Sequence, residues 1–402
     1  MAMAYDEACR LLQGERLPAV FVDLDAFERN LERHGRAVAA SGLKIRFATK
    51  SIRVVSLVQK VLAAPFAQGL MCFSIPEAAA LAARGLDDLF VAYPTLQLSA
   101  FETLADLSEQ NKNVSVAVDS AEGVDRIGGV SRRRGVPLRI VIDSDMSLRA
   151  GKGRVHVGVR RSPLHDPDDV VEIAERARDA GLVVHGLLGY EAQVAGLGDD
   201  SPFDAPWTRA AKGLLRRASM RELGERRPKM IEVLRSRGFQ PAFVNGGGTG
   251  SLDLTTRETG VTEVSAGSGL FKPLLFDGYS SAFVRSLEPS CFFALEAVRR
   301  PARGYVTCLG GGYVASGAAG PDKLPEPVLP RGLRLLAAEG AGEVQTPVFG
   351  EAADAIELGG PVVFRHAKAG EVMERFREVL LVQRGRIIER VPTYRGDGFC
   401  LV

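Results

Sequence analysis

Short apolar segments alternate with amphipathic stretches from residue 19 to about residue 285, and this alternation restricts the possible folds more than any other feature. Eight such segments occur, at residues 19–24, 44–49, 69–74, 88–94, 113–119, 138–143, 183–190 and 242–247. Several are continuous apolar runs, as expected for parallel strands that are buried on both faces. Stretches between them, such as "DAFERNLERHGRAVAAS", have helical periodicity. Eight strand–helix units in about 250 residues predict an α/β chain with a closed (β/α)8 TIM-like barrel rather than an open doubly wound sheet.

The sequence beyond about residue 286 has a different texture. It is rich in Gly and Pro and contains short apolar pieces such as "GPVVFRHA" and "REVLLVQRGRIIERV", which are typical of a smaller antiparallel β domain. We therefore predict a barrel over residues 15–285 and a C-terminal antiparallel β domain over residues 286–402. We expect roughly the first 15 residues to pack on the β domain.

The balance of charge excludes some classes of partner. The 402 residues contain 51 Lys and Arg against 49 Asp and Glu, a formal net charge of +2, so we expect neither nucleic acid nor an anionic membrane surface as a partner. No apolar run approaches the roughly 18 residues that would span a bilayer, and the N-terminus lacks the order of a secretory signal. Five scattered cysteines predict reduced thiols in the cytoplasm.

A lysine ends the second apolar segment, which reads "KIRFATK". In a barrel, Lys50 would lie at the carboxyl end of its strand, where the active sites of such barrels collect. A lysine in a partly dry, electropositive pocket loses part of its proton affinity and can form an imine with a carbonyl group. The alternative is a lysine that only marks the end of the strand and extends to water.

Two loops of small residues follow the last strands of the predicted barrel. Successive backbone N–H groups in such loops can surround a phosphate, and two of them late in a barrel match its usual phosphate site after strands seven and eight. A dinucleotide-binding fingerprint does not fit, because the G-x-G-x-x-G spacing is missing. A pair of ordinary tight turns is the alternative. The candidate ligands are Gly247, Gly248, Thr249 and Gly250 in "NGGGTGS", and Gly267 and Ser268 in "SAGSG".

Two further strand ends carry polar side chains. In "VIDSDMSLRAG", Arg149 follows its strand, where a fixed cation would meet a ring nitrogen; pairing with Asp143 or Asp145 at the surface is the alternative. In "VVHGLLGYEAQ", Tyr190 lies at another strand end. An amine for an aldehyde, an arginine for a pyridine nitrogen and two phosphate loops together suggest pyridoxal 5'-phosphate as the cofactor.

These motifs resemble a known family, the fold-type III pyridoxal phosphate enzymes, in the branch of the D-threonine aldolases and D-serine dehydratases. The resemblance runs over nearly the whole chain, from "LPAVFVDLDAFERNL" and "IRFATK" through "DMSLRAG" and "LLGYEAQ" to "NGGGTGS" and "SAGSG". It implies a Schiff-base lysine at Lys50, cofactor contacts from Arg149 and Tyr190, and an alanine-racemase-like barrel with a C-terminal β domain. It also implies a homodimer with active sites at the interface.

The sequence departs from this family at its metal motif. Metal-dependent members carry a C-terminal His followed two positions later by Cys or Asp, whereas "FRHAKAGE" has His366 followed by Lys368. An ammonium group has no lone pair to offer a metal. We therefore expect no divalent metal unless another residue is recruited, with Glu371 as the only nominee, and contacts to substrate or structure for His366 and Lys368.

The resemblance predicts a pyridoxal phosphate-dependent lyase that acts on a D-configured or 3-hydroxy amino acid by retro-aldol cleavage or by dehydration. Lys50 is one candidate base, and His366 or a tyrosine is the second; Tyr394 in "VPTYRGDG" is expected at the mouth of the site, with a simple β-turn as the alternative. An amino acid racemase on the same scaffold is the runner-up. A non-catalytic pyridoxal phosphate carrier and a barrel that binds another phosphorylated metabolite are alternatives of other classes.

Overall fold

The computed structural model describes residues 3–150 and 155–401. Eight parallel strands close into a barrel in the order β10-β11-β2-β3-β4-β5-β6-β9. The barrel closes where Ala266 of β11 pairs with Phe47 of β2. The predicted barrel is thereby confirmed. Its strands are β2 (Lys44–Ala48), β3 (Ala67–Cys72), β4 (Leu89–Val91), β5 (Val114–Val118), β6 (Arg139–Asp143), β9 (Val183–Gly189), β10 (Phe243–Gly246) and β11 (Glu263–Ala266).

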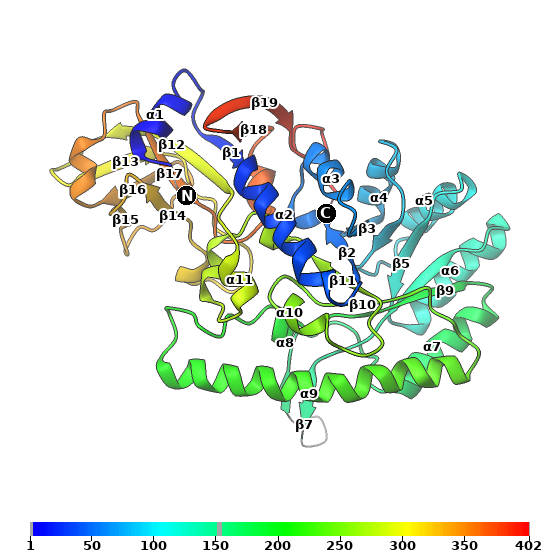
Figure 1. Cartoon of the computed structure of the whole chain (residues 1–402). Coiled ribbons are helices and arrows are strands. Elements are labelled where there is room, and N and C mark those ends of the chain that lie inside the picture. The colour runs from blue at the N-terminus through cyan, green and yellow to red at the C-terminus, as the bar shows by residue number, and fades with distance from the viewer. Residues whose placement is uncertain (1–2, 151–154, 402) are drawn as a thin grey trace.

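Helices surround the barrel, and the longest of them, α9, runs across its lower side in Figure 1. Several begin at side-chain caps: Ser74, Ser120 and Asp23 each accept a hydrogen bond from a backbone N–H in the first turn. The helices are α2 (Leu24–Ala39), α3 (Val55–Leu62), α4 (Ile75–Ala82), α5 (Leu98–Glu109), α6 (Ala121–Arg134), α7 (Pro167–Asp179), α8 (Ala192–Ala195), α9 (Pro206–Ser236), α10 (Leu252–Thr255) and α11 (Ala282–Ser286). None of the helices in the described part of the chain has both the length and the apolar character needed to cross a membrane.

A second, largely antiparallel sheet forms beside the barrel (Figure 1). Its strand order is β15-β16-β13-β12-β1-β18-β19, with β17 paired to β12 and β14. The strands are β1 (Ala19–Asp23), β12 (Cys291–Arg299), β13 (Tyr305–Leu309), β14 (Glu326–Leu329), β15 (Arg334–Leu335), β16 (Gln345–Phe349), β17 (Pro361–Arg365), β18 (Glu378–Gln383) and β19 (Arg386–Pro392). Helix α1 (Tyr5–Leu11) packs against β17, where the Tyr5 hydroxyl donates a hydrogen bond to the Pro361 carbonyl.

The position of β1 corrects one expectation. Residues 19–24 were expected to form the first barrel strand, but β1 lies inside the β sheet, antiparallel to β12 and parallel to β18. The eighth barrel strand is β11, which the sequence indicated only as the approach to the second small-residue loop. Both segments are apolar and buried on both faces, so composition alone does not tell which sheet either one joins.

Short elements connect the main strands and helices. The hairpin of β7 (Leu148–Ala150) and β8 (Val155–Val157) follows β6. The 3-10 turns are η1 (Thr49–Ser51), η2 (Ser268–Leu270), η3 (Leu274–Gly278), η4 (Pro321–Lys323), η5 (Glu351–Ala355) and η6 (Glu371–Arg375). Two of them, η1 and η2, directly follow barrel strands β2 and β11, at the end of the barrel where a site is expected.

Candidate active site

A cavity of about 270 Å³ opens at the carboxyl ends of the barrel strands. Strands β2, β3, β9, β10 and β11 contribute to its wall, and a segment of the β domain around Lys368 closes one side. Catalytic side chains of (β/α)8 barrels come from these strand ends, so this cavity is the candidate active site. It brings together several residues that the sequence predicted: Lys50, Tyr190, Gly247, Gly248, Thr249, Gly267 and Ser268.

Lys50 lies in η1, the turn that follows the buried strand β2. Its Nζ donates a hydrogen bond of 2.6 Å to the Tyr93 hydroxyl. The β domain holds this turn in place, because the backbone of Gly370 lies so close that a Cβ would collide with the Lys50 carbonyl oxygen. Gly370 also has a φ of +82°, which glycine adopts without the strain that a side chain would add.

An arginine that the sequence did not single out also lines the cavity. Nη2 of Arg161 donates hydrogen bonds to the Ala92 carbonyl and to Oδ2 of Asp143, both at 3.1 Å. The guanidinium carbon lies 5.2 Å from the centre of the Tyr93 ring and 5.6 Å from that of Tyr190. Arg161 is therefore a fixed cation between two aromatic rings in the cavity wall.

Two tyrosines of the wall, and the Asp143 carboxyl buried behind Arg161, have pKa values shifted from their ordinary range. Burial raises the pKa of Asp143 to about 6, although the neighbouring Arg161 opposes the rise. Burial also raises the pKa of Tyr190 to about 12. For Tyr93 burial acts in the same direction, but the positive charges of Lys50 and Arg161 outweigh it and lower the pKa of this phenol below its usual range. Perturbed groups gathered in and directly behind one cavity wall are typical of functional sites.

Arg149 does not lie where it was expected. It is on β7 and donates two hydrogen bonds to Oδ2 of Asp145, at 3.1 and 2.6 Å, outside the wall of the cavity. The surface pairing that the sequence left open is the one the structure contains. The chain turns away after β6 through the β7–β8 hairpin and returns at Arg161, which lines the cavity that Arg149 does not reach.

The two small-residue loops lie side by side and are bonded to each other. The Thr249 hydroxyl accepts hydrogen bonds from the N–H groups of Gly267 and Gly269, at 3.4 and 3.1 Å. The Ser268 hydroxyl lies 3.2 Å from that of Ser51, next to Lys50. Gly248 faces the cavity, and a Cβ there would lie 3.0 Å from the Ala195 side chain. Gly250 does not line the cavity; its carbonyl accepts a hydrogen bond from Arg216 behind the loop.

A buried carboxylate behind the first loop was missed by the sequence argument. Glu191 follows Tyr190 and is fully buried. It accepts hydrogen bonds from the Gly247 N–H at 3.1 Å and the Ser251 hydroxyl at 3.0 Å, and from the Thr255 hydroxyl. Arg227 pairs with it at 3.0 Å. Glu191 therefore ties the loop after β10 to the end of β9; the signal in the sequence was a charged residue inside an apolar stretch.

His366 and Lys368 lie at the junction of the two domains. They line a second cavity of about 340 Å³, which shares Arg53, Lys368 and Glu371 with the first. Burial lowers the pKa of His366 to about 3, so this imidazole is neutral. Lys368 Nζ contacts the Glu371 carboxylate at 2.9 Å and the Ser316 hydroxyl at 2.8 Å.

These residues do not fit a divalent metal. The only nominee for a second ligand, Glu371, is engaged by Lys368 and by the N–H and hydroxyl of Ser316. Within residues 3–150 and 155–401, no three His, Cys, Asp or Glu side chains form a group that could hold a metal ion. The Lys368 side chain ends in an ammonium group, which has no lone pair to offer a metal.

Tyr394 lies behind the wall rather than at the mouth. Its side chain is 1% exposed, and its hydroxyl donates a hydrogen bond of 2.9 Å to Glu77 on α4. Its backbone N–H binds the Arg53 carbonyl, three residues from Lys50. This position corrects the expectation that Tyr394 lines the site, and it links the C-terminal tail to the turn that carries the lysine.

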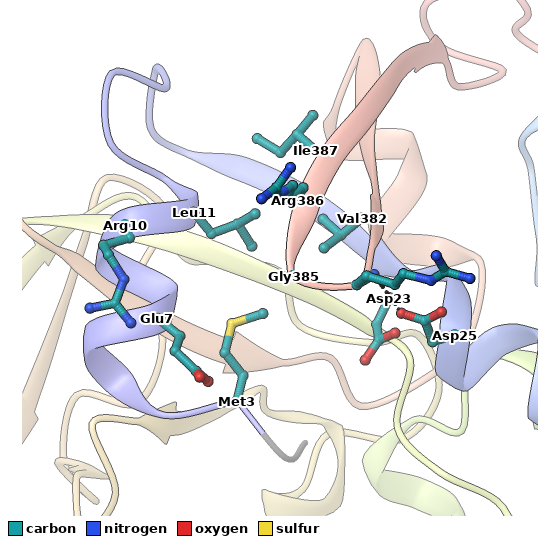
Figure 2. A pocket seen from close by; sticks show the side chains of 11 residues that line it. Met3, Glu7, Arg10, Leu11, Asp23, Asp25, Val382, Gly385, Arg386 and Ile387 are labelled. Atoms are coloured by element: carbon teal, nitrogen blue, oxygen red, sulfur yellow. Dashed lines mark hydrogen bonds between the residues drawn. The ribbon is translucent and has the colours of Figure 1, made fainter.

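The residues of the barrel cavity fit pyridoxal phosphate. Lys50 offers an amine, Arg161 a fixed cation for a ring nitrogen, and the loops at 247–249 and 267–268 offer small residues that leave room for a phosphate. A larger open hollow of about 760 Å³ lies between α1 and the β18–β19 turn (Figure 2). Its wall contains charged groups of both signs, such as Glu7, Arg10 and Asp25, but it lies in the β domain, away from the ends of the barrel strands.

Fold and cavity together define a two-domain protein with an alanine-racemase-like (β/α)8 barrel and a β domain. The family model described as "Alanine racemase, N-terminal domain" matches residues 22–273, more than half of the chain, and the chain belongs to this family. The family resemblance predicted from the sequence is thereby confirmed.

Curated relatives share about a quarter of the sequence. The chain is 27% identical to the 3-hydroxy-D-aspartate aldolase of Paracoccus denitrificans (strain Pd 1222) over 255 residues, 63% of this chain and 60% of the relative. It is 24% identical to the D-threonine aldolase of Arthrobacter sp over 286 residues, 71% of this chain and 69% of the relative. The chain thus spans about 60% of the length of the first of these relatives.

Solved structures resemble the whole chain. The D-threonine aldolase of Filomicrobium marinum superposes with a TM-score of 0.77 at 21% identity, covering 96% of this chain and 97% of that one. The D-threo-3-hydroxyaspartate dehydratase of Delftia sp. HT23 gives a TM-score of 0.75 at 20% identity, covering 95% and 98%. These likenesses establish the fold of both domains.

Proposed function

We propose that the protein is a pyridoxal phosphate-dependent lyase that acts on a D-configured or 3-hydroxy amino acid, by retro-aldol cleavage or by dehydration. The observation that carries this proposal is the convergence of Lys50, Arg161 and the two small-residue loops on one cavity. The relatives support it, because they are named as aldolases and a dehydratase of hydroxy amino acids.

Each group of the site has a distinct part in this proposal. Lys50 is the amine that holds the cofactor aldehyde, and the loops after β10 and β11 hold its phosphate. The cofactor supplies an electron sink for the bond that breaks at Cα. Arg161 would offer the ring nitrogen a fixed cation in place of a carboxylate, so that this nitrogen would carry no proton. A weaker sink makes the reaction depend on well-placed acid and base groups.

We also infer a metal-independent reaction. Lys368 is the cation that the β domain presents to the cavity, held by Glu371 and Ser316. Its ammonium group attracts the carboxylate or hydroxyl oxygen of a substrate without coordination chemistry. Turnover should therefore persist after exhaustive chelation, and loss of turnover that added divalent metal restores would contradict this inference.

A substrate panel tests the proposed function. The protein, loaded with pyridoxal phosphate, is incubated with both enantiomers of threonine, serine and 3-hydroxyaspartate, and aldehydes, 2-oxo acids and the opposite enantiomer are measured. Aldehyde or 2-oxo acid supports the lyase, the opposite enantiomer alone supports a racemase, and no turnover leaves a pyridoxal phosphate carrier.

A pair of lysine variants tests the assignment of the amine. Lys50→Met should abolish both turnover and the visible absorption band of the bound cofactor. Lys44→Met is the matched control, because Lys44 begins the same strand and binds the Pro65 carbonyl outside the cavity. A visible band that survives in Lys50→Met would refute the role of Lys50.

We further infer that the chain forms a homodimer, as the family resemblance suggests, and that it is cytoplasmic, because its five cysteines are scattered. Light scattering on the purified protein and fractionation of cells would test these two points. A monomeric mass or a secreted protein would contradict them.

A further inference from the structure

Tyr93 contacts the amine of Lys50 directly. It follows β4 at the barrel mouth, and its hydroxyl oxygen lies 2.6 Å from Lys50 Nζ. Its backbone is fixed as well, because Arg161 binds the carbonyl of the preceding residue, Ala92. The residue is 37% exposed and lines the cavity, so a substrate bound there can reach its side chain.

The charges around Tyr93 favour proton exchange. Lys50 in η1 and Arg161 beyond β8 bring two positive charges to the phenol, while the facing carboxylate, Asp143 on β6, is itself bound to Arg161. These cations hold the pKa of Tyr93 below its usual range. In contrast, burial raises the pKa of Tyr190 to about 12, so that second phenol in the wall is the poorer acid.

We propose that Tyr93 is a catalytic acid–base residue that serves the 3-hydroxyl group of the substrate and exchanges its proton with Lys50. This assignment rests on the proposed function, because it requires a substrate with an oxygen on Cβ. Tyr93 would thus be a second proton-transfer group next to Lys50. The sequence had suggested His366 or Tyr394 for this role.

The proton balance closes for dehydration. Lys50 Nζ accepts the proton of Cα, and the electron pair of that bond forms the Cα–Cβ double bond. The Cβ–O bond breaks with its electron pair on oxygen, and Tyr93 gives this oxygen a proton so that water leaves. The proton on Lys50 then passes to the phenolate across the 2.6 Å contact, which restores both groups.

The same two groups serve retro-aldol cleavage with their protonation states reversed. The Tyr93 phenolate accepts the hydroxyl proton, the electron pair of the O–H bond forms the carbonyl of the leaving aldehyde, and the Cα–Cβ bond breaks with its pair on Cα. The Lys50 ammonium then protonates Cα. Transfer of the proton from Tyr93 back to Lys50 resets the pair.

The test compares two reactions of one variant. Tyr93→Phe keeps the ring and removes only the hydroxyl, and it should lower kcat for the best hydroxy amino acid of the panel by about 100-fold or more, with KM changed less than about threefold. It should retain exchange of the Cα hydrogen of alanine with deuterated water, because this reaction needs Lys50 but no acid for a hydroxyl. Tyr305→Phe is the matched control, a tyrosine 39% exposed on β13.

Each result has a defined meaning. Loss of turnover with retained Cα exchange supports the assignment to Tyr93. Turnover within about threefold of wild type overturns it, and so does an equal loss of both reactions, since Tyr93 would then only position Lys50. Failure of the proposed function is recognised separately, because the wild-type protein itself would then process none of the hydroxy amino acids.

Discussion

At the scale of single residues, the candidate site is an arrangement of fixed positive charges around an amine. Arg161 is held by Asp143 and by a backbone carbonyl, and it lies against two aromatic rings. Arg149 lies on the β7–β8 hairpin outside the cavity, where the Asp145 carboxylate binds it. The two arginines belong to the same stretch of the chain, yet only one meets the cavity, so they form a natural pair for comparison.

Replacing each arginine by glutamine separates these positions. Arg161→Gln should weaken pyridoxal phosphate binding by about tenfold or more, because a charge-assisted contact contributes roughly 1.5–3 kcal/mol. Arg149→Gln should leave the affinity unchanged. Titration of the cofactor against the absorbance of each variant measures both constants. Equal losses in the two variants, or a loss only in Arg149→Gln, would contradict the placement of Arg161.

The sequence could place some site residues and not others for physical reasons. Lys50, Tyr190 and the two loops directly follow apolar strands, so the period of the strands locates them at the barrel rim. Tyr93 has the same relation to β4 and was overlooked because a tyrosine also suits a strand. Arg161 lies beyond a hairpin, and only the return of the chain after β8 brings it to the cavity, which no local pattern encodes.

At the scale of elements, one buried carboxylate couples the end of β9 to the loop after β10. Glu191 joins the Gly247 N–H, the Ser251 and Thr255 hydroxyls and the Arg227 guanidinium. The first small-residue loop is therefore shaped before any ligand binds, which lowers the cost of ordering it around a phosphate. The sequence predicted the loop but not the group that holds it, because this contact joins residues over fifty positions apart.

Glu191→Gln tests this coupling. Removing the charge leaves Arg227 with Glu258 as its remaining carboxylate partner, so we expect a loss of stability on the order of 3 kcal/mol. We also expect the preference for pyridoxal phosphate over unphosphorylated pyridoxal to fall, because the loop no longer has its fixed shape. Urea unfolding and paired titrations with both compounds measure the two effects. An unchanged preference would show that the loop holds its shape without Glu191.

At the scale of the whole molecule, the two domains are interleaved around the lysine. The first strand, β1, belongs to the C-terminal sheet, although α2 after it packs on the barrel. Gly370 of the β domain touches the Lys50 carbonyl, and Tyr394 near the C-terminus reaches Glu77 on α4. Parallel strands and the barrel were predictable from periodicity, but this interleaving was not, since β1 has the composition of a strand for either sheet.

Glu77 makes the junction of barrel and tail sensitive to pH. Burial raises the pKa of Glu77 from the ordinary 4.5 to about 7, although the Phe73 N–H and the Tyr394 hydroxyl favour its ionised form. Between these pH values the folded protein keeps a proton that the unfolded chain releases. The stability that comes from this proton is complete below about pH 4.5 and is lost as the pH rises through about 7.

Glu77→Gln keeps the shape of the side chain and removes its ionisation. Relative to wild type, we expect the variant to gain free energy of unfolding as the pH rises from about 4.5 to about 7, by on the order of 3 kcal/mol in total. Urea unfolding of both proteins at a series of pH values measures this difference, with Glu122→Gln on the exposed face of α6 as the control. Asp143 and Glu258 also have raised pKa values. Their effect on the pH dependence of the free energy of unfolding should be the same in wild type and control. A difference between variant and wild type that stays constant with pH would mean that the tail is not held through a protonated Glu77.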